Sequence, residues 1–353
     1  MFEHIRDVAL PIGVIAPFSG NLSVCWLDTR NITYAALSQH SNVHIANWDN
    51  KTDSEINWET INIVDEVTDR PVEITAVGLV HPNARNFPVV IVGSTTSVQI
   101  YDVKKNVTRV MFQISLESIL KEYSVNKDVG AYCKGISCND NTVLVGTHSG
   151  EIMMLMCNGE SNFSSRKTLK EHKTPVADIA TCRYDEITCS ASGDGEIIVW
   201  QKPVKAVSIR ILTKHPINIV NVLRKHVIVG TLRGIIQFYS VLTGDLACQI
   251  HAHARPISSI SVAPESAYIL SASEDSQFFI YKLHTRKPHP FQAEHRFGMH
   301  LPDKLIVGAQ FTNGRGSSVA VASYDQTAIS MYKIKKLQAP LPAAAEQPIQ
   351  PQV

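Results

Sequence analysis

The stretch His172–Trp200 recurs 81 residues later as His253–Tyr281, in the same phase, and this internal repeat constrains the fold more than any other feature of the chain. The aligned segments Thr188–Asp194 and Ile269–Asp275 carry the same Ser-Ala-Ser and the same aspartate. A fixed internal period indicates repeated supersecondary units, each too small to bury its apolar surface alone. An offset of this size has room for two units of about 40 residues, so a further copy should lie between the two stretches.

That intermediate copy is present. It begins at His215 and contains the core Val227–Tyr239, which matches Val143–Leu155 in a fourth unit. Weaker echoes, most degenerate in the first two units and the last, bring the set to seven, with a small residue before each turn: Ala36, Gly93, Gly146, Ala191, Gly230, Ala272 and Ala322. A period near 40 is typical of four-stranded propeller blades. The sequence therefore predicts an all-β fold, a single seven-bladed β-propeller.

The clearest unit predicts four strands in order. They are Val176–Thr181, Glu186–Ser190, Glu196–Gln201 and Val204–Leu212, from the innermost to the outermost. Such runs are rich in β-branched residues and are separated by Gly, Asn, Asp and Pro, as strands and turns require. Neighbouring blades cover both faces of each sheet, which explains apolar runs that do not alternate.

The two ends of the chain are expected to close the ring. The last unit offers three strands, near 305–311, 318–323 and 328–334, and no fourth follows. The apolar run Val8–Val14 precedes the first complete unit, and we expect it to supply the missing outer strand and so remove an exposed edge. The propeller is thus predicted over residues 1–336, and the Pro-, Ala- and Gln-rich residues 337–353 are predicted to form a disordered tail.

Bulk composition points to a globular protein with few special demands. The formal net charge of +1 gives no reason to expect a nucleic-acid partner. No apolar stretch reaches the 18 residues that a spanning helix needs, so at most a peripheral membrane or vesicle association is expected. The seven cysteines form no Cys-x-x-Cys pair, which fits a reducing, cytoplasmic compartment.

Residue patterns that could carry chemistry have simpler structural explanations. The histidines near 251–253 and 284–300 lack accompanying Cys, Asp or Glu groupings, so no metal site is expected. Gly146 and Gly150, and likewise Gly230 and Gly234, lie in strand turns with no helix after them and no Walker lysine, so no phosphate-binding loop or cofactor is expected.

One set of polar residues recurs with the repeat and resembles the pattern of WD-repeat proteins. The first copy is His172, Ser190, Asp194 and Trp200, and the second is His253, Ser271, Asp275 and Tyr281. The resemblance implies that each set forms one hydrogen-bonded chain inside its blade. A His-Ser-Asp combination also suggests a hydrolase triad, but a catalytic site is not expected twice in one chain, so we interpret both sets as structural.

Propeller geometry places the connections between blades and the inner turns on one face around the channel mouth. Residues predicted to lie there, and so to contact partners, are His215, Arg233, His251, Arg255 and Tyr324. Arginine and tyrosine are common in binding hot spots, although ordinary solvated loops would show them too. In the connection 115–129, apolar residues at helix spacing predict a helical turn that packs on the ring or docks a partner.

The whole chain resembles the family of WD repeat-containing protein 54. The resemblance is carried, in chain order, by Asn21–Val24, Arg30–Tyr34, Ile250–Arg255, Leu270–Asp275 and Gly308–Phe311. It implies a non-enzymatic propeller of the cytoplasm and of vesicle or membrane surfaces. It further implies self-association and, in mammals, a link to growth-factor receptor signalling.

Three functions remain open on the sequence. The first is a non-catalytic scaffold that binds protein segments on the channel-mouth face. The second is a subunit of a ciliary or vesicle-coat type of assembly, bound through blade edges. The third is a ubiquitin-ligase substrate receptor, suggested by Trp48-Asp49-Asn50-Lys51, which differs from a Trp-Asp-x-Arg signature at its last residue.

Overall fold

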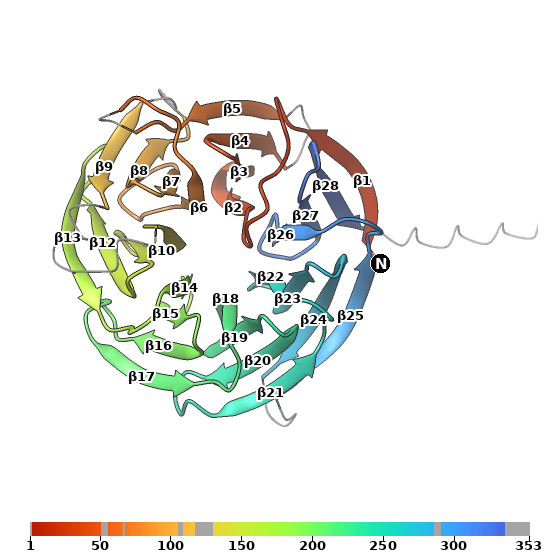
Figure 1. Ribbon diagram of the computed structural model, residues 1–353. Helices are drawn as coiled ribbons and strands as arrows, with labels where there is room; N and C mark the ends of the chain where they lie inside the picture. Colours follow the sequence, from red (N-terminus) through yellow and green to blue (C-terminus); the bar gives the residue numbers. More distant parts are fainter. Residues whose placement is uncertain are drawn as a thin grey trace, which may run out of the picture.

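Seven four-stranded antiparallel sheets surround a central axis (Figure 1). The structure is a computed structural model that describes residues 2–50, 56–65, 68–104, 109–116, 130–285 and 291–335. The expected all-β, seven-bladed propeller is therefore confirmed. Within the described ranges the helical content is a single 3-10 turn, η1 (Asp28–Arg30). The predicted tail at 337–353, and residues 117–129 of the predicted helical turn, lie outside those ranges.

Each blade contributes one strand to each of four concentric layers. The innermost strands of blades 1 to 7 are β2 (Ser23–Leu27), β6 (Ile74–Val80), β10 (Cys133–Asn139), β14 (Val176–Cys182), β18 (Ile217–Leu223), β22 (Ile257–Ala263) and β26 (Ile306–Phe311). The second strands are β3 (Ile32–Gln39), β7 (Val89–Ser94), β11 (Thr142–Thr147), β15 (Ile187–Ser192), β19 (His226–Thr231), β23 (Tyr268–Ser273) and β27 (Ser318–Ser323).

The two outer layers follow the same order. The third strands are β4 (Asn42–Asp49), β8 (Ser97–Asp102), β12 (Glu151–Cys157), β16 (Glu196–Trp200), β20 (Ile235–Ser240), β24 (Gln277–His284) and β28 (Ala328–Ile334). The outermost strands are β5 (Asn57–Asn62), β9 (Val110–Ser115), β13 (Phe163–Lys170), β17 (Val207–Leu212), β21 (Leu246–His251), β25 (Gln292–His300) and, in blade 7, β1 (Phe2–Ala9).

The N-terminal strand closes the ring, but it lies earlier in the chain than predicted. β1 pairs with β28 from Phe2 opposite Ile334 to Ala9 opposite Ala328, so only the last two residues of β1 belong to the predicted run Val8–Val14. The outermost strand of a blade is half exposed and therefore mixes polar and apolar residues, as Phe2–Ala9 does. The apolar residues that follow enter the connection to blade 1, where Ile15 is fully buried.

The strands of the clearest unit agree with the prediction to within a few residues. The largest difference is the outer strand, which begins at Val207 rather than Val204. A turn occupies the intervening residues, and the Gln201 N–H donates to the Ala206 carbonyl at 2.8 Å to close it. Val204 is buried in that turn beside Trp200.

Apolar side chains fill the spaces between adjacent blades. Ala191 and Val199 of blade 4 share one cluster with Val222 and Val227 of blade 5. Because each sheet is covered on both faces, its second and third strands are almost wholly buried. All seven cysteines are free thiols, and most lie in these interfaces as small buried residues.

Polar side chains join the innermost strands around the axis. Asp178 Oδ2 accepts from the Val220 N–H at 2.9 Å, which links blades 4 and 5. Ser259 Oγ donates to the Ala309 carbonyl at 2.7 Å, which links blades 6 and 7. The inner strands have no neighbour on the channel side, so these bonds pair backbone groups that would otherwise be buried without partners.

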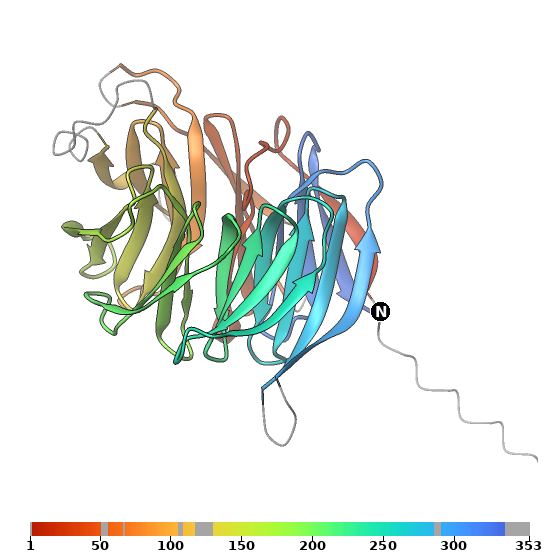
Figure 2. The same ribbon diagram turned by 60° about the horizontal axis from the view of Figure 1, so that its bottom comes forward.

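The strands run between the two ends of the ring (Figure 2). One end carries the connections between blades together with the turns between second and third strands, and we call it the connection face. Bonds between these segments hold it together, for example from the Leu232 N–H to the Pro216 carbonyl at 3.0 Å and from the Glu274 N–H to the Pro256 carbonyl at 3.2 Å. The other end carries the remaining turns, and we call it the opposite face.

Candidate functional site

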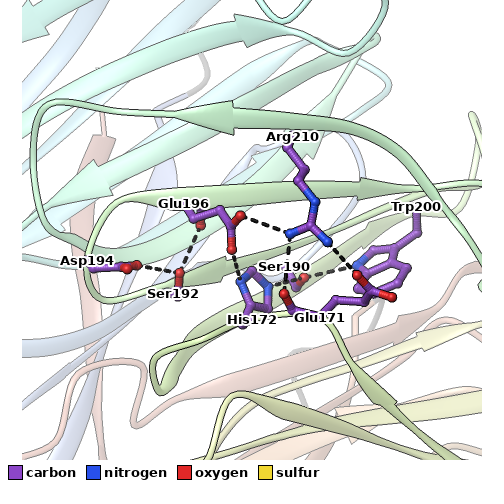
Figure 3. Close-up of polar contacts among 8 residues, drawn as sticks. All are labelled: Glu171, His172, Ser190, Ser192, Asp194, Glu196, Trp200 and Arg210. Atoms are coloured by element: carbon purple, nitrogen blue, oxygen red, sulfur yellow. Dashed lines mark hydrogen bonds and ion pairs between the residues drawn. The ribbon is translucent and has the colours of Figure 1, made fainter.

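The polar set of blade 4 forms a buried chain of hydrogen bonds (Figure 3). The Trp200 indole N–H donates to Ser190 Oγ at 2.9 Å, and Ser190 Oγ lies 2.7 Å from His172 Nε2. An indole can only donate, so the serine hydroxyl has its own proton left to donate to the imidazole. Ser190 is fully buried and is bonded on both sides. Its hydroxyl is therefore inaccessible to solvent and holds the blade together.

Glu196, not the predicted Asp194, completes this chain. His172 Nδ1 lies 3.1 Å from Glu196 Oε2, while Asp194 accepts from Ser192 Oγ at 2.6 Å and is exposed (Figure 3). The turn directs Asp194 toward the serine before it, whereas Glu196 begins β16 and its longer side chain reaches back to the imidazole. The prediction that Asp194 bonds to His172 was therefore wrong.

Arg210 of β17 supports the glutamate from the outer strand. Its Nη1 donates to Glu196 Oε1 at 2.9 Å, and its Nη2 donates to the Glu171 carboxylate (Figure 3). Burial lowers the pKa of His172 below 6.5, and the neighbouring Glu196 charge only partly offsets this effect. The imidazole is thus neutral near pH 7, which fits an Nδ1–H donor and an Nε2 acceptor.

Blade 6 uses the aspartate that the repeat predicts. His253 Nδ1 lies 3.1 Å from Asp275 Oδ2, and His253 Nε2 lies 3.0 Å from Ser271 Oγ. Asp275 Oδ2 also accepts from the Ala254 N–H at 2.9 Å, so one carboxylate fixes both the histidine and the connection that carries it. Here Ser273 donates to the Arg255 carbonyl at 3.1 Å instead of to the aspartate, which leaves Asp275 free for the imidazole.

Tyr281 does not take the place of tryptophan in the blade 6 chain. In the described structure it packs against the rings of His295 and Phe279, with centroids 5.7 and 6.4 Å away, rather than bonding to Ser271. Burial raises the pKa of Tyr281 to about 12. A phenol is shorter than an indole and carries its polar atom at the tip, so the substitution keeps the apolar packing but not the bond.

The five residues predicted to contact partners all lie at the connection face. His215 precedes β18, Arg233 lies in the β19–β20 turn, His251 ends β21, Arg255 lies between β21 and β22, and Tyr324 follows β27. The side chains of Arg233, His251 and Arg255 are exposed, Tyr324 is 43% exposed, and His215 is partly buried. They come from blades 5 to 7 and from the connection that leads into blade 5.

Sequence reasoning missed the exposed apolar residues at the same end. Leu232, beside Arg233, is 44% exposed, and Leu212, at the end of β17, is 78% exposed. Ile12 in the β1–β2 connection is 63% exposed. Each ends or follows a strand, so an apolar residue there resembles a strand residue in the sequence. Only the strand bounds show that Leu212 ends its strand and that Leu232 and Ile12 lie in connections.

A cavity of about 450 Å³ occupies the channel, lined by residues from all seven inner strands. Its connection-face end holds Lys134, Asn218 and Ser19, and Lys134 Nζ donates to Asn218 Oδ1 at 3.1 Å. Asp178 also lines it, and burial raises the pKa of this carboxyl to about 6. Sequence analysis did not single out these residues, because they are far apart in the chain, between positions 19 and 218, and share no motif.

At the opposite face the turn after β14 reaches across blade 3. Arg183 donates to the carbonyl of His81, which follows β6 of blade 2. Arg183, Tyr184 and His81 line that end of the cavity. The channel is thus bordered by charged and aromatic side chains at this end.

Neither a metal-binding cluster nor a membrane-spanning helix occurs in the part of the chain that the structure describes. No group of three or more His, Cys, Asp or Glu side chains is placed to hold a metal ion among them. Within the same ranges, no helix has the length and apolar character needed to cross a membrane.

The ring of seven sheets and the bonded His-Ser pairs of blades 4 and 6 define the class of protein, a WD-repeat β-propeller. The comparison with known families is more specific. The family described as WDR54 matches residues 1–334, and the chain belongs to this family.

Curated mammalian relatives agree with this assignment over part of the chain. The rat protein named WD repeat domain 54 is 34% identical over 204 residues, which cover 55% of this chain and 61% of the rat protein. The human WD repeat-containing protein 54 is 30% identical over 216 residues, which cover 57% of this chain and 63% of that protein. The chain therefore spans less than two thirds of the length of the relatives it matches.

A solved structure supports the fold alone. A chain of the structure titled "Crystal Structure of Mitotic Checkpoint Complex" superposes with a TM-score of 0.69. The match covers 95% of this chain and 96% of that one at 16% sequence identity.

Proposed function

We propose that this propeller is a non-catalytic scaffold that binds segments of other proteins on its connection face. WD-repeat propellers generally act by binding other proteins, and membership of the family supports that class of function. The conspicuous His, Ser and carboxylate groups of blades 4 and 6 are used inside the blades. This arrangement favours a binding role over catalysis.

The observation that carries the proposal is the set of exposed side chains at the connection face. Arg233, Arg255 and Tyr324 are of the types enriched in binding hot spots. Leu232 and Leu212 add exposed apolar surface at the same end. An interface that combines an apolar centre with arginine and aromatic residues is typical of protein partners.

Affinity capture from cells with the double charge reversal Arg233→Glu plus Arg255→Glu tests the proposed surface. We expect this variant to lose partners while its melting temperature stays unchanged, since both side chains are exposed. The matched control is Arg166→Glu plus Lys167→Glu on the exposed part of β13, which alters net charge equally. Retention of every partner by the first variant would reject the connection face as the binding site.

A second candidate is a subunit of a larger assembly, bound through blade edges. The outermost strand of each blade leaves one sheet edge without a paired strand, and such an edge can accept a strand from another chain. The same pair of variants separates the candidates, because edge binding would be lost in the β13 variant and kept in the connection-face variant. Gel filtration of a native lysate adds to this test, since a subunit of a large assembly elutes at a high apparent mass.

Location and pathway are proposed on family membership. We propose that the protein acts in the cytoplasm and at vesicle or membrane surfaces, that it self-associates, and that it takes part in receptor signalling. Fractionation of cells and light scattering of the purified chain test location and self-association separately. The ligase-receptor alternative has less support, because Trp48 of its near-signature is buried in the core.

A further inference from the structure

The channel contains an ammonium group that the protein satisfies only in part. Lys134 is the second residue of β10 in blade 3. Its side chain passes the channel side of blade 4 and reaches Asn218 of blade 5. Ala177, at the bulge of β14 between these two blades, is small enough to leave that path open. Among the described residues, Asn218 Oδ1 is the one acceptor within hydrogen-bonding distance of Lys134 Nζ, although an ammonium has three N–H donors.

The backbone holds Lys134 in this place. The next residue, Gly135, has φ +76, and a Cβ there would lie 2.7 Å from the Ile179 N and 2.8 Å from the Asp178 Cα. Only glycine permits β10 to approach β14 this closely. The base of the lysine side chain is therefore fixed by two inner strands.

The orientation of the Asn218 amide follows from its partners. A lysine ammonium can only donate, so the amide atom that faces it must be Oδ1. Nδ2 then donates to the Ile257 carbonyl at 2.8 Å and to Ser19 Oγ at 2.9 Å. The Ser19 hydroxyl accepts this bond, which leaves its own proton available to a ligand.

Among the described residues, the carboxylate whose charge acts on Lys134 is Asp178, and both of its oxygens are bonded to backbone donors. Asp178 Oδ1 accepts from the Ile179 N–H at 2.8 Å, and Oδ2 accepts from the Val220 N–H at 2.9 Å. Burial lowers the pKa of Lys134, and the Asp178 charge opposes this only in part. A second acceptor at the ammonium would therefore offset the part of the desolvation cost that Asn218 and Asp178 leave uncompensated.

We propose that the channel cavity is a binding site for an organic carboxylate, whose oxygens accept from Lys134 Nζ and Ser19 Oγ and whose apolar body lies between the inner strands. The cavity volume of about 450 Å³ is in the range of small-molecule sites. Below the polar end the lining includes Val77, Ile136 and Ile179. One ammonium beside one carboxylate matches a singly charged ligand better than a phosphate dianion.

Two sources can present such a carboxylate: a free organic acid, or the C-terminus of a protein segment. Isothermal titration calorimetry of the full chain with 4-phenylbutanoate, and with pentaalanine bearing a free or an amidated C-terminus, separates them. Binding of the acid without the peptide identifies a small molecule. Binding of the free peptide that is lost on amidation identifies a chain terminus.

Lys134→Met tests the role of the ammonium while keeping most of the side-chain volume. We expect it to weaken binding by about tenfold or more, the effect of losing a hydrogen bond to a charged group. Lys214→Met, at an exposed lysine of the connection face, is the matched control and should bind normally. Unchanged binding by Lys134→Met, or no binding of either probe to the unaltered chain, would overturn the proposal.

A comparison of two ligands on the unaltered protein tests the same proposal without the risk that a variant misfolds. On the unaltered protein 4-phenylbutan-1-ol, which has the same apolar body without the charge, should bind at least tenfold more weakly than 4-phenylbutanoate. Equal binding of the alcohol and the acid would show that the site is only apolar. Tighter binding of inorganic phosphate than of either carboxylate would reject the ligand class. The site lies inside the ring, so none of these results depends on partner binding at the exposed face.

Discussion

His172 Nδ1 is joined to Glu196 Oε2 at 3.1 Å, although the aspartate that the repeat aligns with Asp275 lies two residues earlier, at Asp194. The corresponding imidazole of His253 is joined to Asp275 itself. Blades 4 and 6 thus meet one requirement, a carboxylate for a buried Nδ1–H, from different positions of the same turn. The consequence is measurable, because stability should depend on the residue that makes the bond and not on the residue that fits the motif.

Glu196→Ala should destabilise the protein more than Asp194→Ala. Removing Glu196 leaves the buried His172 Nδ1–H without its partner, which costs ~1–3 kcal/mol, and also deprives Arg210 of one acceptor. Asp194 is exposed and bonds Ser192, so its loss should cost less, ~0.5–1 kcal/mol. Urea denaturation of the two variants measures the difference. If Asp194→Ala were the more destabilising variant, Asp194 rather than Glu196 would be the partner of His172.

Stability should fall as the solution becomes mildly acidic. Burial lowers the pKa of His172 and His253 below 6.5, and their carboxylate partners only partly oppose it. The unfolded chain therefore binds more protons than the folded one once the pH drops through 6.5, so this stability is fully present above about pH 7 and declines below it. Asp178 has the opposite effect on stability, because burial raises its pKa to about 6 and the folded chain therefore binds its proton more tightly than the unfolded chain does. This effect develops mainly below about pH 6.

Denaturation at about pH 7.5 and about pH 6 tests this dependence. We expect a lower free energy of unfolding at the lower pH, and a smaller difference in His253→Gln, which removes one of the titrating groups. A free energy that rises on acidification over this interval would contradict the assignment of neutral, buried histidines.

Asn21→Ala should be strongly destabilising although this residue is not part of the recurring polar sets of blades 4 and 6. The amide is fully buried, donates to the carbonyls of Ala16 and Ser38 at 3.0 and 2.9 Å, and accepts from the Ser38 N–H at 2.8 Å. Leaving these backbone groups without partners should cost ~2–4 kcal/mol. Thermal melting checks the result, with Asn313→Ala at an exposed turn as the control. Equal melting temperatures would mean that water replaces the amide.

Deletion of residues 1–9 should lower the melting temperature sharply. This segment forms β1, which pairs along the whole of β28, and its loss exposes that strand as an open edge. Deletion of residues 337–353 is the control and should leave the melt unchanged. A stable ring without β1 would show that blade 7 holds with three strands.

The sequence predicts the blades well because each blade is a local structure. In blades 1 to 6 the four strands follow one another in the chain, so the turn residues and the 81-residue offset of His172 and His253 are sufficient to place them. Errors arise where tertiary context decides the bounds. The outer strand β1 was predicted too late because its half-exposed residues resemble a loop, and the run that contains Ile15 resembles a strand but is buried in a connection.

The partner of each buried imidazole was less predictable than the blade that contains it. A repeat aligns positions along the chain, but a hydrogen bond depends on side-chain length and on competing donors. Ser192 bonds Asp194 in blade 4, whereas Ser273 donates to a backbone carbonyl in blade 6. This difference is invisible in the aligned Ser-Ala-Ser segments.

By itself, the sequence determined the class of fold and the number of blades, since periodic burial and turn residues act over short distances in the chain. It also indicated closure of the ring by the N-terminus, because the last unit offers only three strands. Only the tertiary structure decided which side chains meet in the channel. Ser19, Lys134 and Asn218 come from three separate parts of the chain and converge because closing the ring brings every inner strand to one axis.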